Sequence, residues 1–114
     1  MSDCIFCKIG NHQIRSMVVY EDAEILAFRD INPQAPVHIL IIPKKHYSAL
    51  SEFQAADAAL LGRLFLAGKA IAAQEKVAER GFRLVLNCGP DAGQSVSHVH
   101  VHLLGGRPMA WPPG

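Results

Sequence analysis

The sequence has no long hydrophobic run and no recognisable export signal. No stretch approaches the about 20 consecutive apolar residues that a membrane-spanning helix requires. The first residues, Met1-Ser2-Asp3-Cys4, carry neither a basic segment nor a long apolar one, which argues against a secretory signal peptide. We therefore expect a cytoplasmic protein with no membrane partner.

The chain also lacks a large excess of either charge. It contains 11 Lys and Arg against 10 Asp and Glu, for a formal net charge of +1 at pH 7. Such a balance provides no broad field to hold nucleic acid or an anionic membrane surface. We expect no nucleic-acid partner, and any anionic ligand must be bound by local donors.

Cysteine is scarce, with three residues, and an odd number in a reducing compartment argues against a disulfide framework. Cys4 and Cys7 form a C-x-x-C pair. Three interpretations stay open: a redox pair, two thiols without a function, or half of a zinc site completed by distant histidines. A redox pair usually begins a helix after a strand. No strand is predicted before Cys4 and Cys7, so redox chemistry is the least favoured interpretation.

What the chain does have is enough apolar material for one core. It has 114 residues, 50% of them hydrophobic, and a chain of this size buries roughly two-thirds of its unfolded surface on folding. It contains no internal repeat and no low-complexity linker. Residues 1–114 are therefore predicted to form a single domain.

Three of the six histidines alternate with apolar residues in the stretch 97–104, which Gly105-Gly106 ends. This pattern predicts one β-strand. Next neighbours on a strand face lie about 6.6–6.8 Å apart, so His98, His100 and His102 are expected in a row on one face. A lone histidine on a strand usually has no catalytic or binding function. Three in a row favour a metal site or a catalytic imidazole with supporting groups.

Further strands are predicted from short apolar runs. Residues 18–20 and 25–28 favour a hairpin, and residues 82–87 favour another strand. Residues 37–42 are the most hydrophobic run, as expected for a central strand buried on both faces. His38 is the one polar residue inside it.

Two helical segments are predicted. Residues 4–9 have the apolar spacing of a short helical turn. Residues 51–54 have the form of a capping box, so we expect a helix from there to about Gln74 with one apolar stripe. In that helix, Gly62 and Gly68 are expected to permit close packing.

Two loops attract attention. Residues 30–36 contain two prolines and cannot serve a central strand ladder. Residues 88–95 carry two glycines and lead directly into the histidines. They form either a plain hairpin loop or an anion cradle, in which backbone N–H groups approach the ligand and Gln94 and Ser95 add donors.

These features belong to a wider set of motifs. His98-Val99-His100-Val101-His102-Leu103-Leu104 has the form His-φ-His-φ-His-φ-φ, where φ is hydrophobic. The stretches that accompany it are 30–36, 42–46, 93–96, 105–107 and 111–114. Over nearly the whole chain, these residues resemble the Hint branch of the histidine triad (HIT) superfamily.

The resemblance implies a fold, an assembly and an activity. The fold is α+β, a HIT-like five-stranded antiparallel sheet with one long helix and a short N-terminal helix. Two protomers would form a homodimer by joining their sheets. The implied activity is the cleavage of purine nucleoside 5′-phosphoramidates and related AMP or GMP adducts to the nucleoside monophosphate. It proceeds through a covalent nucleotidyl-histidine intermediate, with no cofactor for catalysis.

The resemblance also implies roles for individual residues. His100 matches the nucleophile, and Asp30 matches the carboxylate that binds the ribose hydroxyls. Trp111 matches a tryptophan that reaches toward the partner's site. The other catalytic residues would be His38, His98, His102 and Ser95. The phosphate would be bound by Asn87, Gly93, Gln94, Ser95, His100 and His102, and the purine by Ile5, Phe6, Ile9, Ile31 and Leu40.

Cys4 and Cys7 depart from the pattern of the best-known Hint proteins. Other HIT-like proteins hold a structural zinc ion with such a pair and two histidines, which here match His46 and His98. Two thiolates and two imidazoles suit tetrahedral Zn²⁺. If His98 binds zinc, its part is structural and not one of acid–base catalysis.

Three functions therefore stay open. A nucleotide phosphoramidase is favoured by Gln94-Ser95 before the triad and by Asp30 before the central strand. A zinc-binding regulatory protein would bind zinc and nucleotide without turnover. A dinucleotide polyphosphate hydrolase, as in the Fhit branch, is disfavoured by the ending Trp111-Pro112-Pro113-Gly114.

Overall fold

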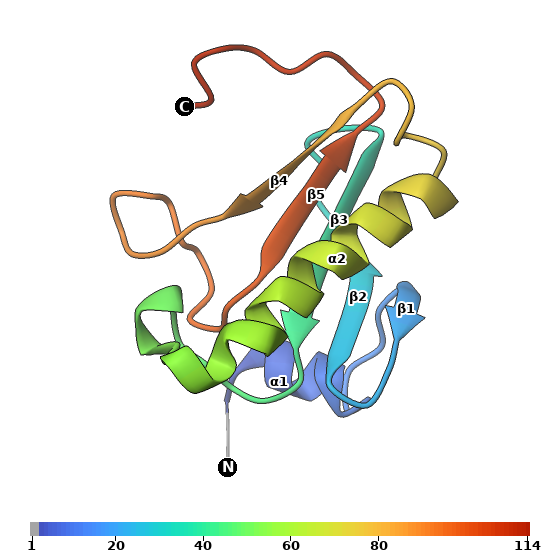
Figure 1. Ribbon diagram of the computed structural model, residues 1–114. Helices are drawn as coiled ribbons and strands as arrows, with labels where there is room; N and C mark the ends of the chain where they lie inside the picture. Colours follow the sequence, from blue (N-terminus) through green and yellow to red (C-terminus); the bar gives the residue numbers. More distant parts are fainter. Residues whose placement is uncertain (1–2) are drawn as a thin grey trace.

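The computed structural model describes residues 3–114 as one antiparallel sheet with a helix on each face (Figure 1). The elements are α1 (Ile5–Gly10), β1 (Val18–Glu21), β2 (Ile25–Arg29), β3 (Val37–Pro43), two 3₁₀ turns (Leu50–Glu52 and Ala55–Asp57), α2 (Ala58–Gln74), β4 (Phe82–Leu86) and β5 (Val101–Gly105). The strand order is β1-β2-β3-β5-β4, and every neighbouring pair is antiparallel. The predicted five-stranded sheet with one long and one short helix is confirmed.

The central strand β3 supplies two hydrophobic cores. Its alternate residues Ile39 and Ile41 pack in the core that α2 covers. Leu40 and Ile42 pack on the opposite face, in the core that α1 covers. All four side chains are at most 6% exposed. The prediction that this run is buried on both faces is therefore confirmed.

Strand β5 begins at Val101, whereas the sequence pattern predicts a strand from Ser97 onward. Before that point the Val99 N–H donates to the Tyr47 carbonyl (2.8 Å), which lies in a loop and not in a neighbouring strand. The predicted alternation still holds. Val99, Val101 and Leu103 are buried in the core against α2, which places the intervening histidines on the α1 face.

The long helix begins later than predicted, at Ala58 and not at Ser51. Two 3₁₀ turns precede it, and the Gln54 N–H donates to a carboxylate oxygen of Asp57 (2.9 Å). The capping interaction is therefore made at Gln54, three residues beyond the predicted one. The helix ends at Gln74 as expected. No helix within residues 3–114 has the length and apolar character needed to cross a membrane.

The two glycines of α2 differ in their surroundings. A Cβ built at Gly68 would lie 2.8 Å from Leu84 Cδ2 and 3.2 Å from Ile41 Cδ1. A Cβ at Gly62 would meet nothing within 4 Å. The expectation of close packing is right for Gly68 and wrong for Gly62.

The replacement of each glycine by alanine should therefore have opposite effects. We expect Gly68→Ala to lower the free energy of unfolding by about 1–2 kcal/mol, because overpacking against β3 and β4 outweighs the gain in helix propensity. Gly62→Ala should raise it by roughly 0.5–1 kcal/mol. Urea denaturation of both variants measures the difference. Equal effects would contradict the close contact at Gly68.

Candidate functional site

Four histidines gather on the α1 face of the sheet. His38 comes from β3 and His102 from β5, while His98 and His100 precede β5. His38, His98 and His100 are 6%, 0% and 3% exposed. Polar groups buried to this extent require hydrogen-bond partners, and those partners determine which ring nitrogen carries the proton.

His100 is held with one nitrogen available for chemistry. Its Nδ1 lies 2.8 Å from the His98 carbonyl oxygen, which can only accept, so Nδ1–H donates and Nε2 carries the lone pair. The ring packs edge-on against Phe6, with ring centres 5.1 Å apart, and against His102 at 4.9 Å. A neutral imidazole fixed in this way is a suitable nucleophile.

His102 is held in the complementary form by a chain of hydrogen bonds. The Gln34 N–H donates to His38 Nδ1 (3.0 Å), so the proton of a neutral His38 is on Nε2. That Nε2–H donates to His102 Nδ1 (2.9 Å). His102 therefore carries its proton on Nε2, as a donor next to the lone pair of His100.

Burial keeps His38 and His102, the two histidines of this hydrogen-bond chain, neutral. It lowers the pKa of His102 to about 4, with smaller contributions from the neighbouring His100 and His38. Burial also lowers the pKa of His38, and the nearby carboxylate of Asp30 only partly opposes it. At neutral pH the hydrogen-bond chain is therefore uncharged and its proton positions are defined.

Asp30, His38 and His102 form a compact group, with one ligand-type atom of each lying within 4.8 Å of the others. Asp30 Oδ2 is 3.5 Å from His38 Nε2. That nitrogen carries a proton, because the Gln34 N–H occupies Nδ1. A protonated nitrogen cannot bind a metal, so this arrangement fits a hydrogen-bond chain better than a metal site.

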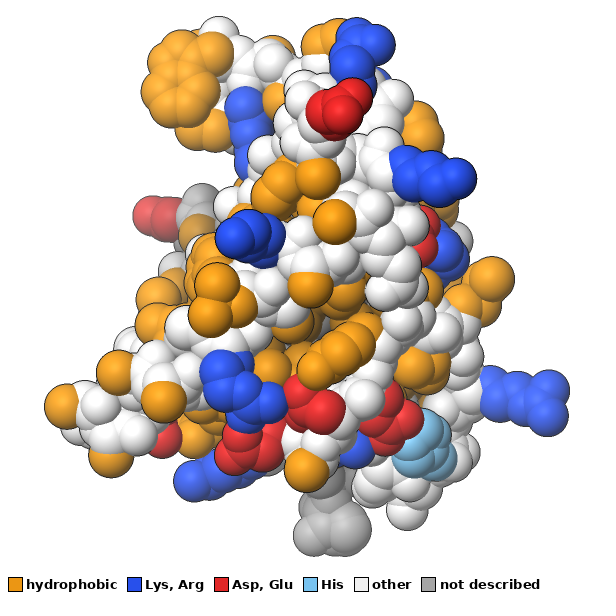
Figure 2. All heavy atoms as spheres, turned by 45° about the vertical axis from the view of Figure 1, so that its right-hand side comes forward, with side chains coloured by type: hydrophobic (Ala, Val, Ile, Leu, Met, Phe, Trp, Pro, Cys, Tyr) orange, Lys and Arg blue, Asp and Glu red, His pale blue; other side chains and the backbone are white. Residues whose placement is uncertain are grey.

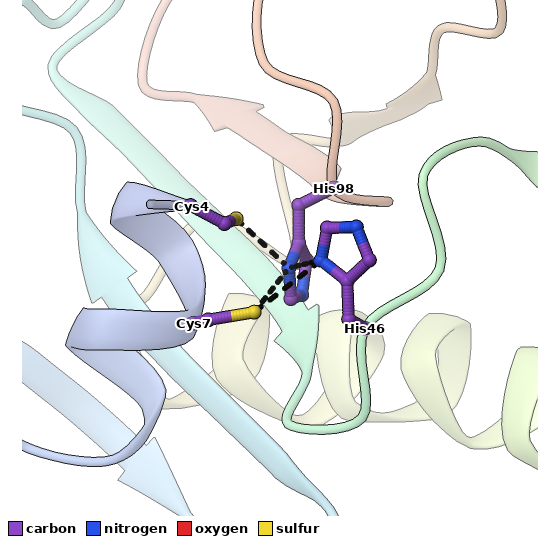
Figure 3. A group of neighbouring side chains, drawn as sticks. All are labelled: Cys4, Cys7, His46 and His98. Atoms are coloured by element: carbon purple, nitrogen blue, oxygen red, sulfur yellow. Dashed lines mark hydrogen bonds between the residues drawn. The ribbon is translucent and has the colours of Figure 1, made fainter. Parts of the chain in front are cut away.

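A second cluster has the composition of a metal centre. Cys4 lies at the start of α1 and Cys7 within it, His46 follows β3, and His98 precedes β5 (Figure 3). His98 Nδ1 lies 3.4 Å from Cys4 Sγ and 3.5 Å from Cys7 Sγ. His46 Nδ1 lies 3.3 Å from Cys7 Sγ and 3.1 Å from His98 Nδ1. The structure thus brings together all four residues that the resemblance assigns to zinc.

These distances fit a tetrahedral ion. Zn–N bonds of about 2.0–2.1 Å and Zn–S bonds of about 2.3 Å place ligand nitrogens about 3.4 Å apart and nitrogen and sulfur about 3.6 Å apart. His98 Nε2–H donates to the Pro43 carbonyl (2.8 Å), which leaves Nδ1 with its lone pair toward the cluster. Burial lowers the pKa of His98, which favours the neutral form that binds metals. The cluster can therefore hold a metal ion.

The loop before the histidines is closed by the side chain of Gln94. Its Oε1 accepts from the Gly89 N–H (2.9 Å), and its Nε2 donates to the carbonyls of Ser48 (2.7 Å) and Val96 (3.0 Å). Gly93 has a φ of +84°, a conformation that favours glycine. The amide of Gln94 thus shapes the loop, whereas the sequence prediction assigns it a contact with phosphate.

The residues expected to bind the purine divide into two groups. Phe6, Ile9 and Leu40 are buried together in the core on the α1 face. Ile5 and Ile31 are 47% and 100% exposed. Trp111, expected to reach toward a partner, is 82% exposed.

A cavity of about 470 Å³ opens beside the histidines. His38, His102 and Asn87 line one part of it, and Gln34, Leu104, residues of β4 and residues of the C-terminal segment 107–114 line the rest. Its wall includes Arg83 and Arg107. Arg107 belongs to the stretch 105–107 that supports the resemblance, but neither arginine is predicted as a site residue. The alternation of a strand over 82–86 would have placed Arg83 and Val85 on one face.

Comparison with known proteins agrees with this geometry. A model of the HIT domain matches residues 11–109. Adenylylsulfatase HINT1 of Arabidopsis thaliana is 54% identical over 99% of this chain and 78% of that protein. The 14 kDa zinc-binding protein of Brassica juncea is 54% identical over 98% of this chain and 100% of that protein.

A solved structure agrees equally well. The crystal structure of a HIT family hydrolase from Legionella pneumophila has a TM-score of 0.96 and 51% sequence identity, over 98% of this chain and 100% of that chain. The likeness therefore extends from the motifs to the whole fold. The chain belongs to the HIT family.

Proposed function

We propose that this protein is a nucleotide hydrolase that cleaves purine nucleoside 5′-phosphoramidates and related 5′-monophosphate adducts. The observation that carries the proposal is the set of hydrogen bonds that determines the proton positions of two adjacent histidines. The Nε2 of His100 has a lone pair, and the Nε2 of His102 carries a proton. A nucleophile beside a fixed donor suits attack on phosphorus with stabilisation of a phosphate oxygen.

The reaction proceeds in two displacements. The lone pair of His100 attacks phosphorus, forming an N–P bond as the bond to the leaving amine breaks. The amine takes up a proton, which the hydroxyl of Ser95 helps to deliver. Water then attacks the same phosphorus and returns a proton to Ser95, the bond to His100 breaks, and the nucleoside monophosphate leaves. His102 Nε2–H and Asn87 donate to the phosphate oxygens throughout, and no cofactor takes part.

The nucleoside part is bound at the other end of the same face. The Asn32 N–H donates to Asp30 Oδ1 (2.8 Å), which orients the carboxylate and leaves lone pairs for the ribose hydroxyls. Ile31 is fully exposed, and a purine ring would cover it. Ile5, 47% exposed, adds to the apolar surface for the ring, and Phe6, Ile9 and Leu40, each 6% exposed, offer it only the edges of their side chains. AMP and GMP adducts both fit this description, as does adenylyl sulfate, the substrate implied by the name of the Arabidopsis relative.

We further propose that the cysteine–histidine cluster holds a structural zinc ion. Support comes from its interatomic distances and from the name of the Brassica relative. His98 then serves as a ligand and not as an acid or base. Its backbone carbonyl positions the nucleophile, because it accepts a hydrogen bond from Nδ1–H of His100.

A homodimer completes the proposal. β4 is an edge strand of the sheet, and its residues are only half-buried. An edge with unpaired backbone groups is a template for pairing with a second copy. Pairing there would extend the sheet across the dimer and bring the exposed Trp111 toward the partner's site.

Phosphorus NMR of the protein with adenosine 5′-phosphoramidate tests the activity. We expect AMP as the product, and a rapidly quenched sample should contain protein heavier by one adenylyl group. Nucleotide binding without AMP formation would favour the alternative of a regulatory binding protein. Faster cleavage of diadenosine triphosphate than of the phosphoramidate would favour the Fhit-type alternative.

A further inference from the structure

The loop that precedes β3 and the segment that follows β5 leave the sheet side by side. In the antiparallel register Val37, the first residue of β3, is opposite Gly105, the last residue of β5. Gly106 has a φ of +92°, and a Cβ built on it would lie 2.9 Å from Pro36 Cβ. A side chain at position 106 would push the two segments apart, so the glycine permits Arg107 to reach this loop.

Arg107 contacts the loop at its main chain. Its Nε and Nη2 groups both donate to the Gln34 carbonyl (3.1 and 3.0 Å), and its Nη1 group donates to the Pro108 carbonyl (3.0 Å). Two donors of one planar guanidinium that converge on one oxygen fix the direction of the carbonyl, which a water molecule would not do. These bonds lie within one chain, so they form whether or not the C-terminal segment also contacts a second copy.

Other cationic side chains of the protein contact carboxylates instead. Figure 2 shows Lys and Arg side chains beside Asp and Glu at the lower end of the molecule. Arg63 is paired in this manner, with Asp22 (2.9 Å) and with Glu24. Exposed ion pairs contribute little to stability and orient nothing beyond the two side chains. Arg107 differs, because the residue that it contacts also contacts the histidines.

Gln34 connects Arg107 to the histidines. Its N–H donates to His38 Nδ1 (3.0 Å), and His38 Nε2–H donates to His102 Nδ1 (2.9 Å). Gln34 lies in no helix or strand, so individual hydrogen bonds determine its position. Its side-chain Nε2 donates to the Asn32 carbonyl (3.0 Å), within the same loop. The bonds from Arg107 are those that attach Gln34 to the segment after β5.

Two neutral histidines in a hydrogen-bond chain can carry their protons in either direction. Here the Gln34 N–H occupies His38 Nδ1, which leaves the proton of His102 on Nε2. Without that N–H, His38 can carry its proton on Nδ1, and His102 would then donate through Nδ1 and have only a lone pair on Nε2. Asp30 Oδ2 opposes this reversal weakly, because 3.5 Å from His38 Nε2 is long for a hydrogen bond.

We infer that Arg107 is a positioning residue, which holds Gln34 and thereby keeps the proton of His102 on Nε2, where the ring donates to the phosphate. The inference rests on the proposed function for the part that His102 plays in the reaction. The proton position itself is a property of the protein without substrate. Arg107 acts through Gln34 and His38 and contacts none of the reacting atoms.

Nitrogen-15 NMR of the histidine rings at pH 7 measures the proton position without substrate, because protonated and unprotonated ring nitrogens have separate signals. His102→Gln protein identifies the signals of His102. Arg107→Met keeps an apolar stem but has no donor, so we expect the His102 Nε2 signal to move toward that of an unprotonated nitrogen. The kcat for adenosine 5′-phosphoramidate should fall about 10-fold, as when one hydrogen bond is lost.

Two further variants complete the experiment. Arg107→Lys restores one donor and should recover part of both the signal position and kcat. Arg63→Met is the matched control, because it removes a guanidinium that contacts Asp22 and Glu24 and not the loop before β3. It should keep the wild-type histidine signals and the wild-type kcat.

The histidine signals decide between positioning and a general structural effect. Wild-type signals in folded Arg107→Met would overturn the inference, even with a lower kcat, because the loss would then not arise from the proton of His102. A moved proton with an unchanged kcat would also contradict it. If the wild-type protein does not cleave the phosphoramidate, the proposed function fails, and the NMR comparison still decides whether Arg107 sets the proton position of His102.

Discussion

His100→Ala is expected to abolish hydrolysis of adenosine 5′-phosphoramidate, with kcat falling by roughly 10⁴-fold or more, as when other enzymes lose a covalent nucleophile. No neighbour can replace the lost nitrogen. The Nε2 of His102 carries a proton because His38 donates to its Nδ1 (2.9 Å). The Nδ1 of His98 faces the cysteine sulfurs at 3.4 and 3.5 Å. Phosphorus NMR of the variant beside the wild type measures the loss.

His12→Ala is the matched control for this experiment. His12 is an exposed histidine that contacts Glu21 (2.8 Å) and lies outside the histidine cluster. Its variant should hydrolyse the substrate at the wild-type rate. Equal AMP formation by His100→Ala and wild type would show that His100 is not the nucleophile. A loss of AMP binding by His100→Ala in calorimetry would show that the substitution disturbs the site as a whole.

The faces of the histidine segment could be predicted from sequence because alternation is a local property of extended chain. Val99 and Val101 lie in the core against α2, and His98 and His100 pack against Phe6 on the other face. The start of β5 could not be predicted. It depends on the Val99 N–H finding a partner in a distant loop.

The proton positions also depend on distant partners. His102 is a donor at Nε2 because of His38, and the proton of His38 is placed by the backbone of Gln34. These contacts join β5 to β3 and to the preceding loop, and no periodicity reports them. Arg83 escaped notice for a similar reason, since only the register of β4 against β5 shows that it shares a face with His102.

Cys4→Ser is expected to remove the proposed zinc ion and to destabilise the fold. A ligand present at 1,000 times its dissociation constant stabilises a protein by about 4 kcal/mol. For a domain of this size, that loss lowers Tm by on the order of 15 °C. α1 has six residues and no side-chain cap at its N-terminus, and isolated helices shorter than about 12–15 residues are marginal in water. Its attachment to His46 and His98 through the metal should therefore account for much of the effect.

Cys88→Ser is the matched control, because Cys88 is exposed and is not a member of the cluster. Elemental analysis after dialysis should find about one zinc per chain in the wild type and in Cys88→Ser, and far less in Cys4→Ser, as for a site that loses one of its four ligands. Differential scanning calorimetry gives the three Tm values. Full zinc content and a wild-type Tm in Cys4→Ser would show that the cluster is not a structural metal site.

The proposed zinc ion should also affect the reaction, although it takes no part in it. Phe6 lies in α1, between Cys4 and Cys7 in the sequence. Its ring packs edge-on against His98 and His100, with ring centres 5.9 and 5.1 Å apart. When the metal is lost, α1 loosens, and both the ring of His100 and the His98 carbonyl that fixes its proton lose support. We expect kcat of Cys4→Ser to fall about 10-fold to 100-fold at a temperature where the variant is still folded, as for other supporting ligands of a site. Unchanged kcat in metal-free, folded protein would show that the metal does not support the position of His100.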